Sequence, residues 1–151
     1  MEAKRQDLMN SIGLLILRVG GGAYMMSHGW GKMQMVLNGQ FNDKFDPIGL
    51  GPHLSLMGAV FGEFFCALLV LVGAGTRAAA AVVVFTMLIA AFVIHFADPW
   101  TMGGGASKEP ALLFATMFAT LIFTGAGKFS VDGMIWPAMR ERRAKRKASG
   151  K

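Results

Sequence analysis

The sequence predicts an all-α protein, a membrane-embedded antiparallel four-helix bundle. Of its 151 residues, 54% are hydrophobic and only 16% are charged, whereas roughly 25% of the residues in a soluble globular domain are charged. A soluble domain of this size keeps too much surface exposed to hide so many apolar side chains. The apolar residues also gather in four stretches, each near the length of about 20 residues that crosses a bilayer. We therefore expect lipid to surround this chain.

Glycine, proline and charged residues separate the four stretches. Because lipid offers the backbone no hydrogen bonds, each stretch should be a helix. The expected spans cover residues 11–33, 54–72, 78–97 and 108–125. They form one domain, residues 11–133, between an N-terminal flank of residues 1–10 and a basic tail of residues 134–151.

The connections between the spans predict how the helices are arranged. The second and third spans are joined by a few residues around GAGTR, which makes them antiparallel neighbours in a compact bundle. The first connection, about residues 34–53, is long and rich in glycine, asparagine, aspartate and proline. We expect this loop to face outside, where it could form a lid.

The placement of lysine and arginine predicts the orientation. With both termini on one side, that side collects Arg77, Lys128 and the basic tail, whereas the other side holds only Lys32, Lys44 and Lys108. The positive-inside rule then places both termini in the cytoplasm of a bacterial-type inner (plasma) membrane, with a multi-pass topology. The tail beside an apolar body fits anionic lipid headgroups, and we expect no nucleic-acid partner.

A stripe of polar side chains follows the first span. Tyr24, His28 and Lys32 are four residues apart and share one helical face, and Arg18 lies within about 40° of it. A charge at membrane depth costs about 2.5–3.5 kcal/mol, so the stripe should face the other helices. Glu63 lies at the middle of the second span, and we expect it to pair with Arg18. A pair that only fixes helix packing is the open alternative.

Further polar groups converge on the predicted outer half of the bundle. His95 ends the third span, Glu109 opens the fourth before Pro110, and Trp100 lies between them. The candidate catalytic residues are His28, Lys32, Glu63 and Glu109. The candidate cofactor-binding residues are Arg18, Tyr24, His28, Lys32, Glu63, His95 and Trp100. Two alternatives stay open: Glu109 as a helix cap and Lys32 as an interfacial anchor.

The sequence restricts the cofactor chemistry without identifying a cofactor. Cys66 is the only cysteine, so an internal disulfide, a CxxC pair and a thiolate-rich metal site are excluded. No spacing of histidines and carboxylates predicts a metal site. A haem held by His28 and His95 ranks below a quinone, whose ring would find hydrogen-bond donors in the polar stripe.

The order of the motifs resembles that of the DoxX family of small four-span membrane proteins. The chain reads LILRVGGGAYMMSHGWGKM, then GEFFCALLVLVGAGTRAAA, KEPALLF and GAGKFSVDG, between about Leu14 and Gly133. DoxX and DoxD relatives include a membrane subunit of a thiosulfate:quinone oxidoreductase, and other members are associated with redox and oxidative-stress functions. The resemblance places six residues at motif positions without assigning their roles: Arg18, His28, Lys32, Glu63, Glu109 and Asp132.

Two functions compete on this evidence. The first is a quinone-linked or redox-associated membrane component, such as an oxidoreductase subunit. The second is a non-enzymatic membrane partner that recruits a redox enzyme through its tail and loops. Beyond the lipid bilayer, the candidate partners are a soluble or membrane redox protein and a second copy of the chain.

Overall fold

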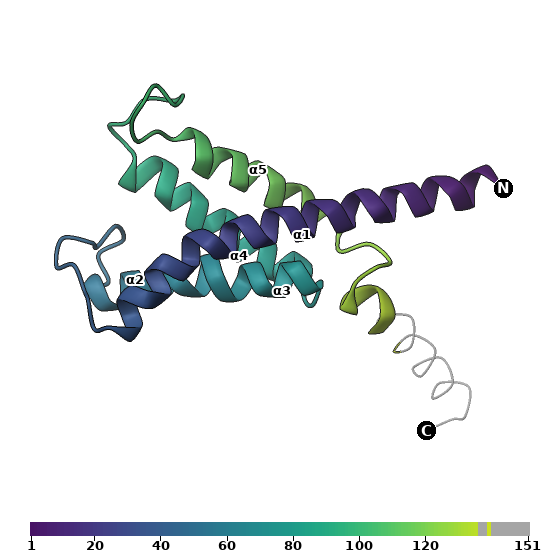
Figure 1. Cartoon of the computed structure of the whole chain (residues 1–151), viewed down its shortest axis with the longest axis horizontal. Coiled ribbons are helices and arrows are strands. Elements are labelled where there is room, and N and C mark those ends of the chain that lie inside the picture. Colours follow the sequence, from purple (N-terminus) through teal and green to yellow (C-terminus); the bar gives the residue numbers. More distant parts are fainter. Residues whose placement is uncertain (136–138, 140–151) are drawn as a thin grey trace.

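The computed structural model describes residues 1–135 and 139, and the regular elements in that part of the chain are helices (Figure 1). The elements are α1 (Glu2–Leu37), α2 (Pro52–Val60), η1 (Phe61–Cys66), α3 (Ala67–Val72), α4 (Thr76–Ile89), η2 (Ala90–Ile94) and α5 (Glu109–Thr124), where η marks a π-helical segment. The expected all-α class is confirmed. Most of the expected basic tail, residues 134–151, lies outside the described residues.

Three of these helices are long and apolar enough to cross a membrane. They are α1 with 36 residues, the unbroken helix Pro52–Val72 with 21, and the unbroken helix Thr76–Ile94 with 19. The fourth, α5, is apolar but has only 16 residues. Helix α1 begins at Glu2 and not near Ser11, because the charged N-terminal flank consists mainly of good helix formers with no proline or glycine to stop them.

The helices alternate in direction, which gives the molecule two distinct ends. The connections 38–51 and 95–108 lie at one end, which we call the loop end (Figure 1). The N-terminus, the connection 73–75 and residues 125–135 lie toward the opposite end, which we call the turn end. The connection 73–75 is as short as expected, because Gly73 and Gly75 adopt the left-handed backbone with φ of 76° and 57°.

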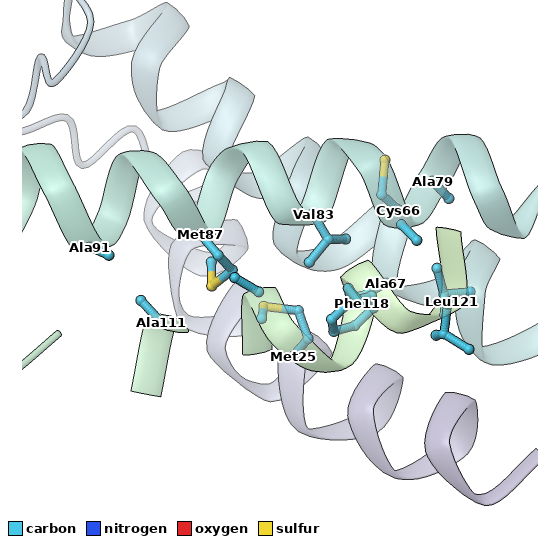
Figure 2. Packing of buried hydrophobic residues seen from close by; sticks show 13 residues of the cluster. Met25, Cys66, Ala67, Ala79, Val83, Met87, Ala91, Ala111, Phe118 and Leu121 are labelled. Atoms are coloured by element: carbon cyan, nitrogen blue, oxygen red, sulfur yellow. The ribbon is translucent and has the colours of Figure 1, made fainter. Parts of the chain in front are cut away.

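The core lies between the helices and consists of small and flexible apolar side chains. Figure 2 shows Met25, Ala67, Val83 and Phe118 converging from four different helices. Alanines along α4 and α5 allow the helix backbones to approach closely. The outer surface is also apolar, and Phe123 is 82% exposed there. An apolar core inside an apolar surface suits a helix assembly surrounded by lipid.

The packing of η1 positions the site described below. A Cβ atom on Gly29 of α1 would lie 2.7 Å from the carbonyl carbon of Glu63 and from the backbone nitrogen of Phe64. On the opposite side, Gly62 leaves room only for the side chain of Thr86 from α4. The backbone of η1 is therefore held between α1 and α4, and its one carboxylate side chain, Glu63, is buried between the helices.

Candidate functional site

Arg18 does not pair with Glu63, so that expectation is wrong. The Arg18 guanidinium, 1% exposed, donates from Nη2 to the carbonyl oxygen of Phe129 and packs against Gly73 at the turn end. The partner of Glu63 is Lys32. Lys32 follows Arg18 by fourteen residues on α1, which separates these two cations by about 21 Å at about 1.5 Å per residue. Helical side chains lean toward their own N-terminus. Because the two helices are antiparallel, Lys32 and Glu63 lean toward each other.

Asp132 completes the cluster around Arg18. Its carboxylate accepts hydrogen bonds from the backbone nitrogens of Gly75 at 2.8 Å and Thr76 at 2.9 Å, which caps the start of α4. Burial pushes the pKa of Asp132 up, but these N–H groups and the nearby Arg18 guanidinium outweigh it and lower the pKa below its usual value. The contacts of Arg18 and Asp132 join the chain after α5 to the other helices, which is a structural role.

The ion pair of Lys32 and Glu63 is the only charged contact between helices that the structure shows within the described apolar helices. Lys32 Nζ contacts Glu63 Oε1, and the carboxylate is buried. No donor from the described residues reaches the second oxygen, Oε2. Glu63 also lies in a π-helical segment, a local distortion that occurs frequently at functional sites.

Two cavities meet at this ion pair, and both Lys32 and Glu63 line each of them. The first, the loop cavity, measures about 190 Å³ and lies between η1 and α4, with Phe45 and Ile48 of the connection 38–51 in its wall. The second, the histidine cavity, measures about 260 Å³. Its further lining includes Met25, His28, His95, Ser107 and Phe114. The walls of both cavities are mainly apolar.

Two of the expected site residues join the ion pair in the histidine cavity. His28 of α1 packs edge-on against the ring of Phe114, with ring centroids 5.5 Å apart. His95 follows η2, and its Nδ1 lies 2.6 Å from a carboxylate oxygen of Asp98. The cavity therefore brings together His28, Lys32, Glu63 and His95.

The other expected residues lie elsewhere. Tyr24 is 70% exposed and lines neither cavity. Trp100 is exposed at the loop end, where the Lys108 ammonium lies 5.6 Å from its ring centroid. Glu109 accepts a hydrogen bond from the backbone nitrogen of Met102 at 2.8 Å and so fixes the connection before α5. Because Met102 lies outside α5 and no side-chain hydrogen bond caps the start of that helix, this contact is not the helix cap that the sequence left open.

Sequence reasoning missed several groups that shape the site. Asp46 accepts hydrogen bonds from the Ser55 hydroxyl at 2.7 Å and from the backbone nitrogens of Leu50 and Gly51, and the Ser55 hydroxyl is the main group that lowers the pKa of Asp46. These bonds fix the connection 38–51 against α2. Lys108 is buried and donates to the carbonyl oxygens of Phe96 and Asp98. The DP and GP pairs in residues 46–52 were the available signal for this turn.

Metal ligation finds no support in the geometry. Within residues 1–135 and 139, no three histidine, cysteine, aspartate or glutamate side chains gather closely enough to hold a metal ion. Cys66 is buried and unpaired with another cysteine. The polar groups at the ion pair are an ammonium and a carboxylate, and mainly apolar walls surround them.

The comparisons with known proteins give one match. The DoxX family model matches residues 13–96, more than half of the chain. The matched range contains Lys32, Glu63, His28 and His95, whereas α5 and Asp132 lie beyond it. No curated protein and no solved structure matches the chain.

Proposed function

The chain belongs to the DoxX family of membrane proteins, and on that premise we propose that it is a quinone-linked, redox-associated membrane component. The quinone headgroup binds beside the Lys32–Glu63 pair, in the histidine cavity. The observation that carries this proposal is an ion pair between a half-buried lysine and a buried glutamate, shared by two mainly apolar cavities, with two histidines beside it.

In this proposal α1, Pro52–Val72, Thr76–Ile94 and α5 form an antiparallel four-helix bundle in a bacterial-type inner membrane. Helix α5 packs along α4 and buries Ala111, Ala115, Phe118 and Leu121 against the core. Both termini are cytoplasmic, in line with the excess of lysine and arginine at the turn end and in the tail. The loop end, and with it the site, then lies in the outer half of the membrane.

A quinone headgroup suits the chemistry of these cavities. It is a flat, mostly apolar ring with oxygen atoms at its edge, and it enters the protein from lipid. The Lys32 ammonium carries three donors, and only one contact to Glu63 is shown. Each cavity is smaller than the roughly 300–1,000 Å³ of a pocket that encloses a drug-sized molecule. The histidine cavity therefore suits a small headgroup of one or two fused rings, and the loop cavity suits a segment of an apolar chain.

The protein's own residues supply binding and proton handling in this proposal. Lys32 donates to a ring oxygen, and His28, His95 and Glu63 hold or accept protons next to it. Cys66 is the only cysteine, so no dithiol of this chain supplies electrons. The electrons therefore pass between the quinone and a soluble or membrane redox partner.

A double variant tests whether the ion pair binds a quinone or only holds the helices together. Lys32→Met with Glu63→Leu replaces the ion pair by apolar side chains of similar size, an exchange that is often neutral or stabilising for a fold. In nanodiscs, we expect the wild-type protein to bind a radiolabelled short-chain quinone above the background of empty discs. The double variant should bind it at least about tenfold more weakly, a loss of about 1.4 kcal/mol, with an unchanged or higher thermal midpoint. Equal binding by both proteins would refute the proposal.

A further inference from the structure

We infer that the site prefers the reduced, hydroxyl-bearing form of its ligand, a hydroquinone, over the quinone. This inference rests on the proposed function and concerns which redox form the cavity retains. It follows from the unfilled hydrogen-bonding capacity of two buried atoms, Glu63 Oε2 and Ser107 Oγ, which belong to two residues in the wall of the histidine cavity.

Glu63 presents an acceptor that the described protein residues do not satisfy. Its side chain is 2–3% exposed, and Lys32 contacts only Oε1. An ionised carboxylate has no hydrogen to donate, so Oε2 can be satisfied only by a donor. A buried acceptor without a donor costs free energy, and a ligand that brings an O–H group removes that cost.

The hydroxyl groups in the wall of the loop cavity already donate their hydrogens to other acceptors. The Thr86 hydroxyl donates to the carbonyl oxygen of Val82 at 3.0 Å. The Ser55 hydroxyl donates to Asp46 at 2.7 Å. Both residues line the loop cavity beside Glu63. A donor for Oε2 is therefore expected from a ligand and not from these side chains.

Ser107 offers a second polar contact at the wall of the same cavity. It is 5% exposed, and its hydroxyl has no partner among the described residues. A hydroxyl can donate or accept, so Ser107 can bond either a ring hydroxyl or a ring carbonyl. Ser107 is therefore a second polar contact for a ligand oxygen in this cavity.

The selectivity arises from Glu63 alone. A hydroquinone O–H donates to Oε2, whereas a quinone carbonyl would place a second acceptor against a carboxylate oxygen. Lys32 and Ser107 can serve both forms, because an ammonium donates to either kind of oxygen and a hydroxyl adapts. The preference should therefore follow the chemistry of residue 63.

Three probes of nearly the same shape test the preference in the wild-type protein. They are 2-methyl-1,4-naphthalenediol kept reduced under anaerobic conditions, its 1,4-dimethyl ether, and 2-methyl-1,4-naphthoquinone. Each probe carries its own radiolabel, and its direct binding to protein in nanodiscs is measured in a separate sample, so that the diol never meets a quinone with which it could exchange electrons. We expect the diol to bind at least about tenfold tighter than the other two, about 1.4 kcal/mol.

Three variants test whether Glu63 causes the preference for the diol. Glu63→Gln presents an amide that both donates and accepts, so it should remove or reverse the preference for the diol. Ser107→Ala should weaken the diol and the quinone to a similar degree and keep their ratio. Glu2→Gln makes the same chemical change on the exposed first turn of α1 and should keep the wild-type ratio.

The possible outcomes separate the two proposals. If none of the three probes binds, the proposed quinone site is wrong. If all three bind with equal affinity, the site stands and the inferred preference is wrong. A preference for the diol that survives Glu63→Gln also overturns the inference, because Glu63 would then not be its origin.

Discussion

Lys32 and Glu63 depend on each other, because each is a charge held among apolar side chains. Lys32 is half-buried, but its loss leaves the buried Glu63 carboxylate without a partner, and an uncompensated buried charge typically costs about 3–5 kcal/mol. We expect Lys32→Met to destabilise the protein by this amount and the additional change Glu63→Leu to restore stability. Reversible unfolding in mixed micelles would measure both. Equal instability of the single and double variants would contradict the assignment.

Asp132 makes the turn end sensitive to acid. Its pKa is lowered in the folded protein, so the unfolded chain takes up the proton more readily. The stabilisation is complete above the ordinary carboxyl pKa of about 3.9 and is lost as the pH falls through the lower folded value.

An asparagine at this position isolates that effect. Between pH 7 and pH 3, the thermal midpoint of the wild-type protein should fall further than that of Asp132→Asn. The difference between the two proteins matters, because other carboxylates also titrate in this range. Parallel curves for the two proteins would show that Asp132 contributes nothing to the acid response.

Among the contacts between helices, the one at Gly29 determines how closely α1 approaches η1. A methyl group there would lie within 2.7 Å of the backbone at Glu63 and Phe64, which cannot move as a side chain would. We expect Gly29→Ala to destabilise the protein by about 1–3 kcal/mol and to weaken quinone binding, because it separates Lys32 from Glu63.

Gly31 provides the matched control on the same helix. A Cβ atom at Gly31 meets nothing within 4 Å, and alanine favours a helix over glycine by roughly 0.5–1 kcal/mol. Gly31→Ala should therefore leave quinone binding unchanged and stability equal or higher. If both substitutions have the same effect, the close contact at Gly29 is not what positions the ion pair.

Hydropathy and glycine placement predicted the all-α class, because they report directly on burial in lipid and on turns. The same signals could not predict η1 and η2, since a π-helical segment depends on how neighbouring helices fit and leaves no local pattern. The partner of Glu63 was mispredicted for a related reason. Helical spacing placed Arg18 and Lys32 near one face, but only the packed structure shows which cation reaches Glu63.

The candidate site residues show the same difference between what a sequence pattern predicts and what only packing reveals. His28, Lys32, Glu63 and His95 were predicted because polar groups are rare in apolar stretches, and the structure brings them to one cavity. Ser107 was missed because a serine in a glycine-rich connection is common in any loop. Its significance comes from burial without a partner, which requires the three-dimensional structure.

The proposed orientation of the whole molecule rests on its asymmetric charge. In a Cys66→Ala background, Glu2→Cys places a single thiol on α1 at the turn end, and Asp43→Cys places one in the connection 38–51 at the loop end. In intact cells, a membrane-impermeant maleimide should label Asp43→Cys and not Glu2→Cys. If Asp43→Cys were labelled only after the cells are lysed, or if Glu2→Cys were labelled in intact cells, cytoplasmic termini would be contradicted.

The most direct test of the central claim is to locate a bound quinone. A photoreactive azido-quinone would be activated on the nanodisc-embedded protein, and the labelled peptides would be identified by mass spectrometry. We predict labels on α1 around His28 and on the segment from Ser107 to Phe114. Unlabelled quinone added before activation should prevent this labelling, and the Lys32→Met/Glu63→Leu variant should not show it. Labels confined to exposed side chains such as Tyr24 and Phe123, unchanged in that variant, would contradict a site at the ion pair.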